Sequence, residues 1–132
     1  MTELTNSPPT VLVCDDEPVL RALVRASLDG ACTVVEAADG EESLELARRI
    51  RPALIIIDMM MPGRSGLEVV GDLRRDPELA AIPVLMLTAR AQATDREQAS
   101  AAGVDRFVSK PFSPSELAAT VAELLGQGNG TH

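Results

Sequence analysis

The chain has 132 residues, of which 45% are hydrophobic, and this suits a single domain with its own core. Twelve Lys and Arg residues against twenty Asp and Glu residues give a formal net charge of −8. An acidic chain repels the phosphate backbone of nucleic acids, so we expect no direct nucleic-acid partner.

No segment is predicted to enter or cross a membrane. Residues 1–10 lack the apolar stretch of a signal peptide, and the longest apolar run, residues 53–57, is too short to span a bilayer. Cys14 and Cys32 do not have the spacing of a metal site, and we interpret them as free thiols in a reducing compartment. The sequence therefore predicts a cytoplasmic protein with no membrane partner.

Short apolar runs alternate with helical patterns from the start of the chain. Residues 1–9 are polar, end in two prolines and are expected to form a flexible N-terminal tail. The apolar run at residues 11–14 predicts a strand buried on both faces. A helix is expected between Pro18 and Gly30, which are typical of the first turn and of the end of a helix. Residues 32–35 predict a second strand.

The middle of the chain repeats this alternation. Asp39 and Glu42 have the spacing of a capping box, in an acidic variant, and predict a second helix. Residues 54–57 are the clearest strand pattern in the chain. The same capping spacing at residues 65–68 predicts a third helix that ends near Arg75, before a proline.

Two further units follow. Residues 84–87 predict a fourth strand, and the capping pattern of Thr94 and Glu97 predicts a fourth helix that ends at Gly103. Residues 104–108 predict a fifth strand.

A last helix is expected to open at residues 113–116, and residues 127–132 are expected to be a flexible C-terminal tail. The folded domain would then span residues 10–126. Five strands separated by helices predict an α/β fold: a doubly wound five-stranded parallel sheet of flavodoxin-like order 2-1-3-4-5, with helices on both faces. Because little sequence follows the last helix, output is expected to run through another protein or a longer parent chain.

Polar side chains follow four of the five predicted strands. Asp15 and Asp16 follow the first strand, Asp58 the third, Thr88 the fourth and Lys110 the fifth. The carboxyl ends of parallel strands lie at one edge of a sheet, where ligands bind in doubly wound folds. We therefore expect these side chains to converge on one crevice.

The expected set has the parts that phosphoryl transfer needs. Clustered carboxylates repel one another unless one keeps a proton or a cation enters, and oxygen-only ligands favour Mg²⁺. Asp58 can act as a nucleophile that forms an acyl phosphate, while Lys110 pairs with anionic oxygens and Thr88 offers a hydroxyl. Taken singly, these residues could be caps, turn residues or solvated side chains; their joint placement favours a site.

Four segments resemble the signature of response-regulator receiver domains. They are Cys-Asp-Asp-Glu at residues 14–17, Ile-Asp-Met-Met-Met-Pro-Gly at 57–63, Leu-Thr-Ala at 87–89 and Ser-Lys-Pro-Phe at 109–112. The resemblance, of the chemotaxis-regulator kind, covers about residues 10–126. It implies a phosphorylatable domain of a two-component or phosphorelay system, which catalyses only its own phosphorylation and dephosphorylation.

The implied partners are a sensor histidine kinase or histidine phosphotransfer protein, which donates from a phosphohistidine, and a downstream effector protein or domain. The effector would bind the surface formed by the fourth helix, the fifth strand and the fifth helix. By the same resemblance Asp58 is the phosphoacceptor, Thr88 and Lys110 bind its phosphoryl group, and the Lys110–Pro111 bond is cis. It also implies that Asp16 and Asp58 ligate Mg²⁺ directly, that Asp15 acts partly through water, and that the backbone carbonyl of Met60 completes the ligands.

The resemblance also implies a switch. Phe107 matches the family's switch aromatic, and it would fill the space that Thr88 vacates when phosphorylation draws the hydroxyl inward; the plainer interpretation is a core phenylalanine. Met60 and Arg90 depart from the polar or acidic residues of the chemotaxis pattern. We expect slow self-dephosphorylation, because a bulky apolar side chain would shield the phosphoryl group from water.

Two other functions could use an acidic pocket of this kind. An aspartyl-phosphate phosphatase of the dehalogenase type needs a second aspartate two residues after the nucleophile, where this chain has Met60. A phosphorylation-independent docking module with a vestigial pocket usually lacks an acidic residue or the lysine, and here all are present. Both are less consistent with the sequence than a phosphorylated switch.

Overall fold

The computed structural model describes residues 8–89, 97 and 100–129. Five strands form one sheet in the order β2-β1-β3-β4-β5, and every neighbouring pair is parallel. This confirms the predicted fold class. The strands are β1 (Thr10–Cys14), β2 (Thr33–Ala37), β3 (Leu54–Asp58), β4 (Val84–Thr88) and β5 (Arg106–Ser109).

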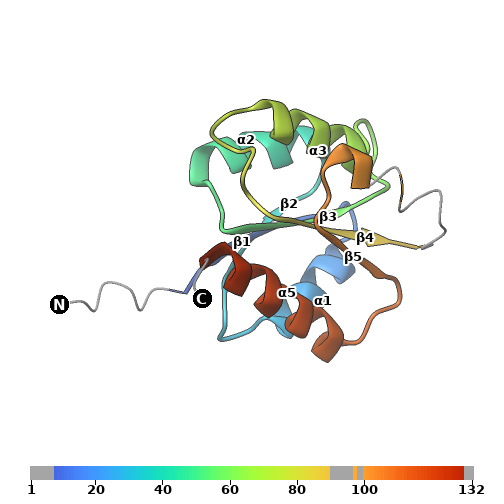
Figure 1. Cartoon of the computed structure of the whole chain (residues 1–132). Coiled ribbons are helices and arrows are strands. Elements are labelled where there is room, and N and C mark those ends of the chain that lie inside the picture. The colour runs from blue at the N-terminus through green and yellow to red at the C-terminus, as the bar shows by residue number, and fades with distance from the viewer. Residues whose placement is uncertain (1–7, 90–96, 98–99, 130–132) are drawn as a thin grey trace.

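Helices cover both faces of the sheet, with α2 and α3 on one face and α1 and α5 on the other (Figure 1). Their bounds are α1 (Pro18–Ser27), α2 (Gly40–Ile50), α3 (Gly66–Arg75) and α5 (Pro114–Asn129). Of the predicted fourth helix, residue 97 and residues 100–102 are helical, while Thr94 lies outside the described residues. Within the described part of the chain, no helix is long and apolar enough to cross a membrane.

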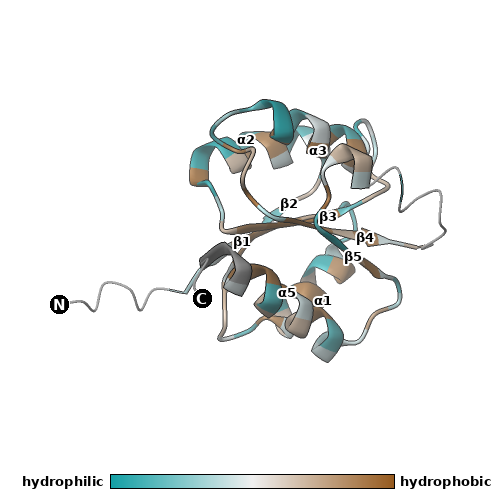
Figure 2. Ribbon diagram, in the orientation of Figure 1, coloured by the Kyte–Doolittle hydropathy of each residue, from teal (hydrophilic) through white to brown (hydrophobic). Residues whose placement is uncertain are grey.

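The core has two aliphatic halves, one on each side of the sheet. Leu12 and Ile55 pack under α2 and α3, whereas the next residue of each strand, Val13 and Ile56, packs under α1 and α5. Apolar colouring accordingly lines the inner faces of the helices and the sheet (Figure 2). Because both faces are buried, the central strands need unbroken apolar runs rather than alternation.

The predicted caps at Asp39 and Ser65 form. Ser65 accepts a hydrogen bond from the backbone N–H of Glu68, whose carboxylate accepts from that of Ser65, so α3 has a full capping box. Asp39 accepts from Glu42 N–H at 2.9 Å. The Glu42 carboxylate bonds the backbone N–H of Ala38 at 2.8 Å, one residue earlier than in the standard box.

Some boundaries differ from the predictions. β2 runs to Ala37 because it pairs with β1 along its whole length, and β5 is Arg106–Ser109 rather than 104–108. The N–H of Asp105 bonds the carbonyl of Val84 at 3.0 Å just before β5 begins. Helix α5 continues past Gly126 to Asn129, so part of the predicted C-terminal tail is helical; a glycine weakens a helix without having to end it.

Candidate functional site

The polar residues singled out from the sequence meet at the carboxyl edge of the sheet. Asp15 directly follows β1, which lies between β2 and β3, and Asp58 is the last residue of β3. Thr88 ends β4, and Lys110 follows β5. The strand order places β1, β3, β4 and β5 side by side, so residues far apart in sequence converge.

Three carboxylates form the centre of the site. Asp15, Asp16 and Asp58 each offer an oxygen, and these oxygens lie within 4.8 Å of one another. The ammonium of Lys110 lies 3.1 Å from Oδ1 of Asp58 and 3.7 Å from Oδ2 of Asp15. With all groups ionised, three negative charges face one positive charge, so the cluster has an unbalanced negative charge.

Asp15 is the most constrained of the three. Its backbone N–H donates to the carbonyl of Ala37 at 3.0 Å, and its Oδ1 accepts from the N–H of Glu17 at 2.8 Å. Its Oδ2 is buried and accepts no hydrogen bond in the described part of the chain. Since a buried acceptor that accepts no hydrogen bond is costly, this oxygen fits a ligand position for a cation.

Burial governs the protonation of the site. The pKa of the Asp15 carboxyl is raised from 3.8 to about 6. Burial is the largest cause and the nearby charge of Asp58 adds to it, while the hydrogen bond from Glu17 N–H lowers the pKa. Burial also raises the pKa of Asp58, opposed by the hydrogen bond and the charge of Lys110. Both shifts mean that the folded protein disfavours the charged carboxylates until a cation compensates them.

The Asp15 shift predicts how stability depends on pH without metal. Because the folded pKa lies above the ordinary value, only the unfolded chain loses the proton between about pH 4 and pH 6, and stability falls as the pH rises through this window. We expect Asp15→Asn to be more stable than the wild type at pH 7 in EDTA, by about 2–3 kcal/mol. Denaturant unfolding followed by circular dichroism should find this difference shrinking toward pH 4. A difference that stays constant with pH would contradict the prediction.

The donor set suits a hard metal ion. All three side chains present oxygen, and these carboxylates are the acidic cluster in the described residues that could hold a cation. A bound cation would interact with the buried Oδ2 of Asp15, which accepts no hydrogen bond from the described residues. It would also stabilise the ionised forms of Asp15 and Asp58, whose pKa values are raised.

The structure describes most of the remaining predicted residues. Thr88 is 5% exposed, and its hydroxyl lies 3.8 Å from Sδ of Met59. Phe107 is partly buried and packs against the aliphatic cluster under α2 and α3. Met60 is 72% exposed, whereas Arg90 lies outside the described residues. The Lys110–Pro111 bond is cis, as expected.

Gly66 is a supporting residue that the sequence analysis missed. A Cβ at this position would lie 2.3 Å from the carbonyl oxygen of Asp58 and 3.0 Å from Cα of Met59. The N–H of Gly66 also donates to the carbonyl of Met59 at 2.9 Å. The start of α3 therefore lies directly against the backbone that carries Asp58. A glycine in the first turn of a helix, where it is a poor helix former, was the available signal.

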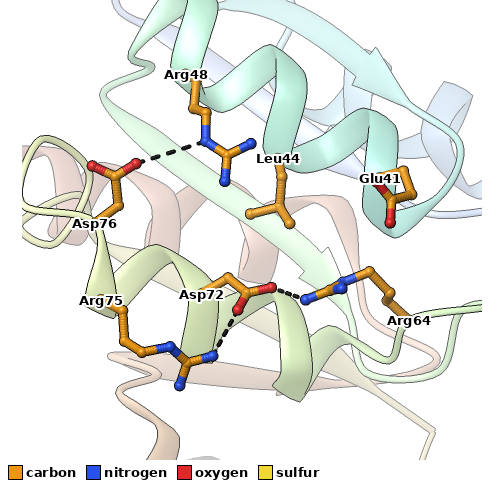
Figure 3. A pocket seen from close by; sticks show the side chains of 7 residues that line it. All are labelled: Glu41, Leu44, Arg48, Arg64, Asp72, Arg75 and Asp76. Carbon is orange, nitrogen blue, oxygen red and sulfur yellow. Dashed lines mark hydrogen bonds and ion pairs between the residues drawn. The ribbon is translucent and has the colours of Figure 1, made fainter.

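A hollow lies between α2 and α3, lined by residues of both helices and by Arg64 of the β3–α3 connection (Figure 3). Asp72 pairs with Arg64 and, at 2.6 Å, with Arg75, while Arg48 lies 3.7 Å from Asp76. Most of the charged side chains that line this hollow are thus paired with one another, which is consistent with a role in packing α2 against α3.

A doubly wound parallel sheet with acidic groups and a lysine at its carboxyl edge is typical of flavodoxin-like α/β proteins that bind a ligand at that edge. Similarity to known proteins identifies the family within this class. Residues 11–122 match the response regulator receiver domain, and the chain belongs to this family. The chemotaxis response regulator CheY4 of Vibrio cholerae is 33% identical and superposes with a TM-score of 0.85, over 89% of this chain and 99% of CheY4.

Longer proteins contain similar segments. The DNA-binding dual master transcriptional regulator RpaA of Synechocystis is 42% identical over 89% of this chain and 49% of RpaA. Hybrid signal transduction histidine kinase D of Dictyostelium discoideum is 42% identical over 93% of this chain and 8% of the kinase. The chain thus spans half or less of the length of these two relatives.

Proposed function

We propose that this domain is a phosphorylation-driven switch in which Asp58 accepts a phosphoryl group from a phosphohistidine. The observation that carries the proposal is the 3.1 Å contact between Lys110 Nζ and Oδ1 of Asp58, inside a cluster of three carboxylates. A carboxylate beside an ammonium, at the edge where doubly wound sheets bind ligands, is suited to take up and hold an anionic group.

Each group has a distinct part in the transfer. A carboxylate oxygen of Asp58 forms a bond to phosphorus, the P–N bond to the donor imidazole breaks, and its electron pair stays on the imidazole nitrogen. Lys110, whose ammonium already lies against Asp58, follows the added phosphoryl oxygens as their counter-charge. Thr88 supplies a hydroxyl donor from the neighbouring strand.

We assign the metal site to Mg²⁺, which Asp16, Asp58 and the backbone carbonyl of Met60 would hold directly and Asp15 partly through water. When bound, Mg²⁺ supplies positive charge to the carboxylates and to the incoming phosphoryl oxygens. In support, the donors are all oxygen and Oδ2 of Asp15 is buried without a hydrogen bond in the described residues.

The proposed donors are a sensor histidine kinase or a histidine phosphotransfer protein, and the output is a conformational change read by an effector protein or domain. The added negative charges would bias Thr88 and Phe107 toward a second arrangement, Thr88 moving toward the phosphoryl group and Phe107 filling the vacated space. Phe107 is only partly buried, which supports a second position for its side chain. We place the phosphoryl transfer in the cytoplasm, where the free thiols of Cys14 and Cys32 stay reduced.

The direct test is to detect a phosphoryl group that is covalently attached to the protein. Incubation with Mg²⁺ and acetyl phosphate is expected to add one phosphoryl group to the intact mass, and EDTA is expected to prevent it. No mass gain with acetyl phosphate, together with no transfer from phosphorylated histidine kinases, would overturn the proposal. Partner binding that needs no phosphoryl group would instead support a docking module.

Met60 is proposed to slow the loss of the phosphoryl group. Its exposed apolar side chain follows Asp58 closely in sequence, where it would hinder the approach of water. Met60→Asn is expected to shorten the lifetime of the phosphorylated domain about three- to tenfold, roughly 1 kcal/mol in the barrier, and Met60→Leu to leave it unchanged. The decay is followed by intact mass after removal of the donor. A wild-type lifetime of seconds would rule out the shielding role.

A further inference from the structure

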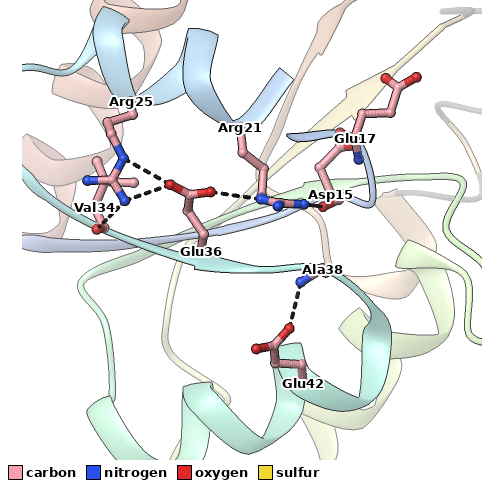
Figure 4. Close-up of polar contacts among 8 residues, drawn as sticks. All are labelled: Asp15, Glu17, Arg21, Arg25, Val34, Glu36, Ala38 and Glu42. Atoms are coloured by element: carbon pink, nitrogen blue, oxygen red, sulfur yellow. Dashed lines mark hydrogen bonds and ion pairs between the residues drawn. The ribbon is translucent and has the colours of Figure 1, made fainter. Parts of the chain in front are cut away.

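An arginine on α1 connects the outer strand of the sheet to the acidic site. The side chain of Arg21 is 16% exposed, and its Nε donates to Oε1 of Glu36 on β2 at 2.8 Å. Its Nη1 donates to the backbone carbonyl of Asp15 at 2.6 Å. In Figure 4, Arg21 lies between Glu36 and the turn of Asp15 and Glu17. One guanidinium thus joins three separate parts of the chain.

The contact completes the bonding around Asp15. The N–H of this residue is bound by the carbonyl of Ala37, its Oδ1 by the N–H of Glu17 and its carbonyl by Arg21. Only Oδ2, within the described residues, has no hydrogen bond, and it lies 3.7 Å from Lys110 Nζ in the acidic cluster. The hydrogen bonds that fix every other polar atom of Asp15 therefore orient this one oxygen toward the cluster.

Arg21 is in turn held by a charged partner. Arg21 and Arg25 both bond Glu36, and these hydrogen bonds lower the pKa of its carboxyl. Arg25 reaches Oε2 of Glu36 at 2.7 Å and the carbonyl of Val34 at 3.2 Å. Glu36 therefore has one oxygen for each arginine and keeps Arg21 aimed along the sheet toward Asp15.

We infer that Arg21 is a positioning residue of the metal site: through the carbonyl of Asp15, it holds Oδ2 of that residue where it can bind a divalent cation or a water on that cation. The inference rests on the proposed function. A guanidinium is needed because Nε and Nη1 bond two acceptors at once in a fixed geometry, which a lysine ammonium cannot reproduce. Outer-shell partners of this kind typically change metal affinity by tenfold or more.

Positioning and simple electrostatics predict opposite results for Arg21→Met. Removal of a positive charge near an acidic site should by charge alone strengthen the binding of a cation. Loss of the contact to Asp15 should weaken it. The direction of the change in Mg²⁺ affinity therefore separates the two effects. Measurement at a temperature where every variant is folded excludes general destabilisation as the cause of weaker binding.

Arg25 offers a matched control. It is an arginine on the same helix with the same partner, Glu36, and is also removed by a change to Met. Its hydrogen bonds go to Glu36 and Val34 rather than to Asp15. Exposed ion pairs contribute little to stability, and the Arg25 side chain is 52% exposed.

The experiment is a calorimetric titration of the full chain with MgCl₂, with folding checked by circular dichroism. Arg21→Met is expected to raise the Kd for Mg²⁺ about tenfold. Arg25→Met should stay within about twofold of the wild type, and Arg21→Lys should lie between the two. At saturating Mg²⁺, uptake of phosphate from acetyl phosphate should return to near the wild-type rate in Arg21→Met.

The outcomes are distinguishable. An unchanged or lower Kd in Arg21→Met, beside a wild type that binds Mg²⁺, overturns the positioning role and leaves the proposed function intact. Equal weakening in Arg21→Met and Arg25→Met also overturns it. If Arg21→Met does not fold, Arg21→Lys decides the question, because a Kd equal to that of the wild type contradicts the need for two donors. A wild type that does not bind Mg²⁺ overturns both this inference and the proposed metal site.

Discussion

Asp58→Asn is expected to abolish phosphoryl uptake from acetyl phosphate and from any histidine donor. The amide has nearly the shape of the carboxylate and lacks the nucleophilic oxygen anion that forms the bond to phosphorus. Lys110, which lies 3.1 Å from Oδ1 of Asp58, would also lose its closest counter-charge. Intact mass after incubation with Mg²⁺ and donor should therefore show no added phosphoryl group.

The loss should be chemical rather than structural. Because burial raises the pKa of Asp58, a neutral side chain at this position should leave the free energy of unfolding unchanged or increase it in EDTA. Asp29→Asn is the control, since Asp29 is exposed and lies just beyond the end of α1 remote from the site. This variant should gain the phosphoryl group as the wild type does. Uptake by Asp58→Asn at the wild-type level would place the acceptor on another residue.

Gly66→Ala is expected to destabilise the domain by about 2–4 kcal/mol, a large effect for the addition of one methyl group. The new Cβ would lie 2.3 Å from the Asp58 carbonyl oxygen and 3.1 Å from its carbonyl carbon. Both are backbone atoms of a buried strand, so they cannot move aside as a flexible side chain would. The β3–α3 connection must shift instead, and phosphoryl uptake on Asp58 should slow as well.

Gly71→Ala in the same helix provides the matched comparison. The nearest atoms to a Cβ there are those of the Arg75 guanidinium, at 3.7 Å or more, which is an ordinary contact. Alanine is the better helix former, so this change should stabilise the domain by about 0.5–1 kcal/mol. Urea unfolding followed by circular dichroism measures both variants. Similar behaviour of the two would mean that the close approach at Gly66 has no energetic consequence.

The sequence by itself determined the class of fold and the members of the acidic cluster. Unbroken apolar runs such as residues 54–57 can be read without a structure, because a strand covered on both faces leaves no polar position. Asp15, Asp58 and Lys110 could be named because a side chain that follows a parallel strand must lie at its carboxyl edge. The capping spacing at Ser65 likewise located the start of α3, since a cap is a local interaction.

Tertiary structure alone decided the features that depend on distances between separate segments. The extension of β2 to Ala37 follows from pairing with β1, and the need for glycine at position 66 follows from the approach of α3 to the β3 backbone. In the sequence, nothing distinguishes Arg21 from other residues of its helix, yet its side chain donates hydrogen bonds both to Glu36 on β2 and to the carbonyl of Asp15. Such contacts link residues whose spacing along the chain carries no periodic signal, so only the packed arrangement of the sheet and its helices defines them.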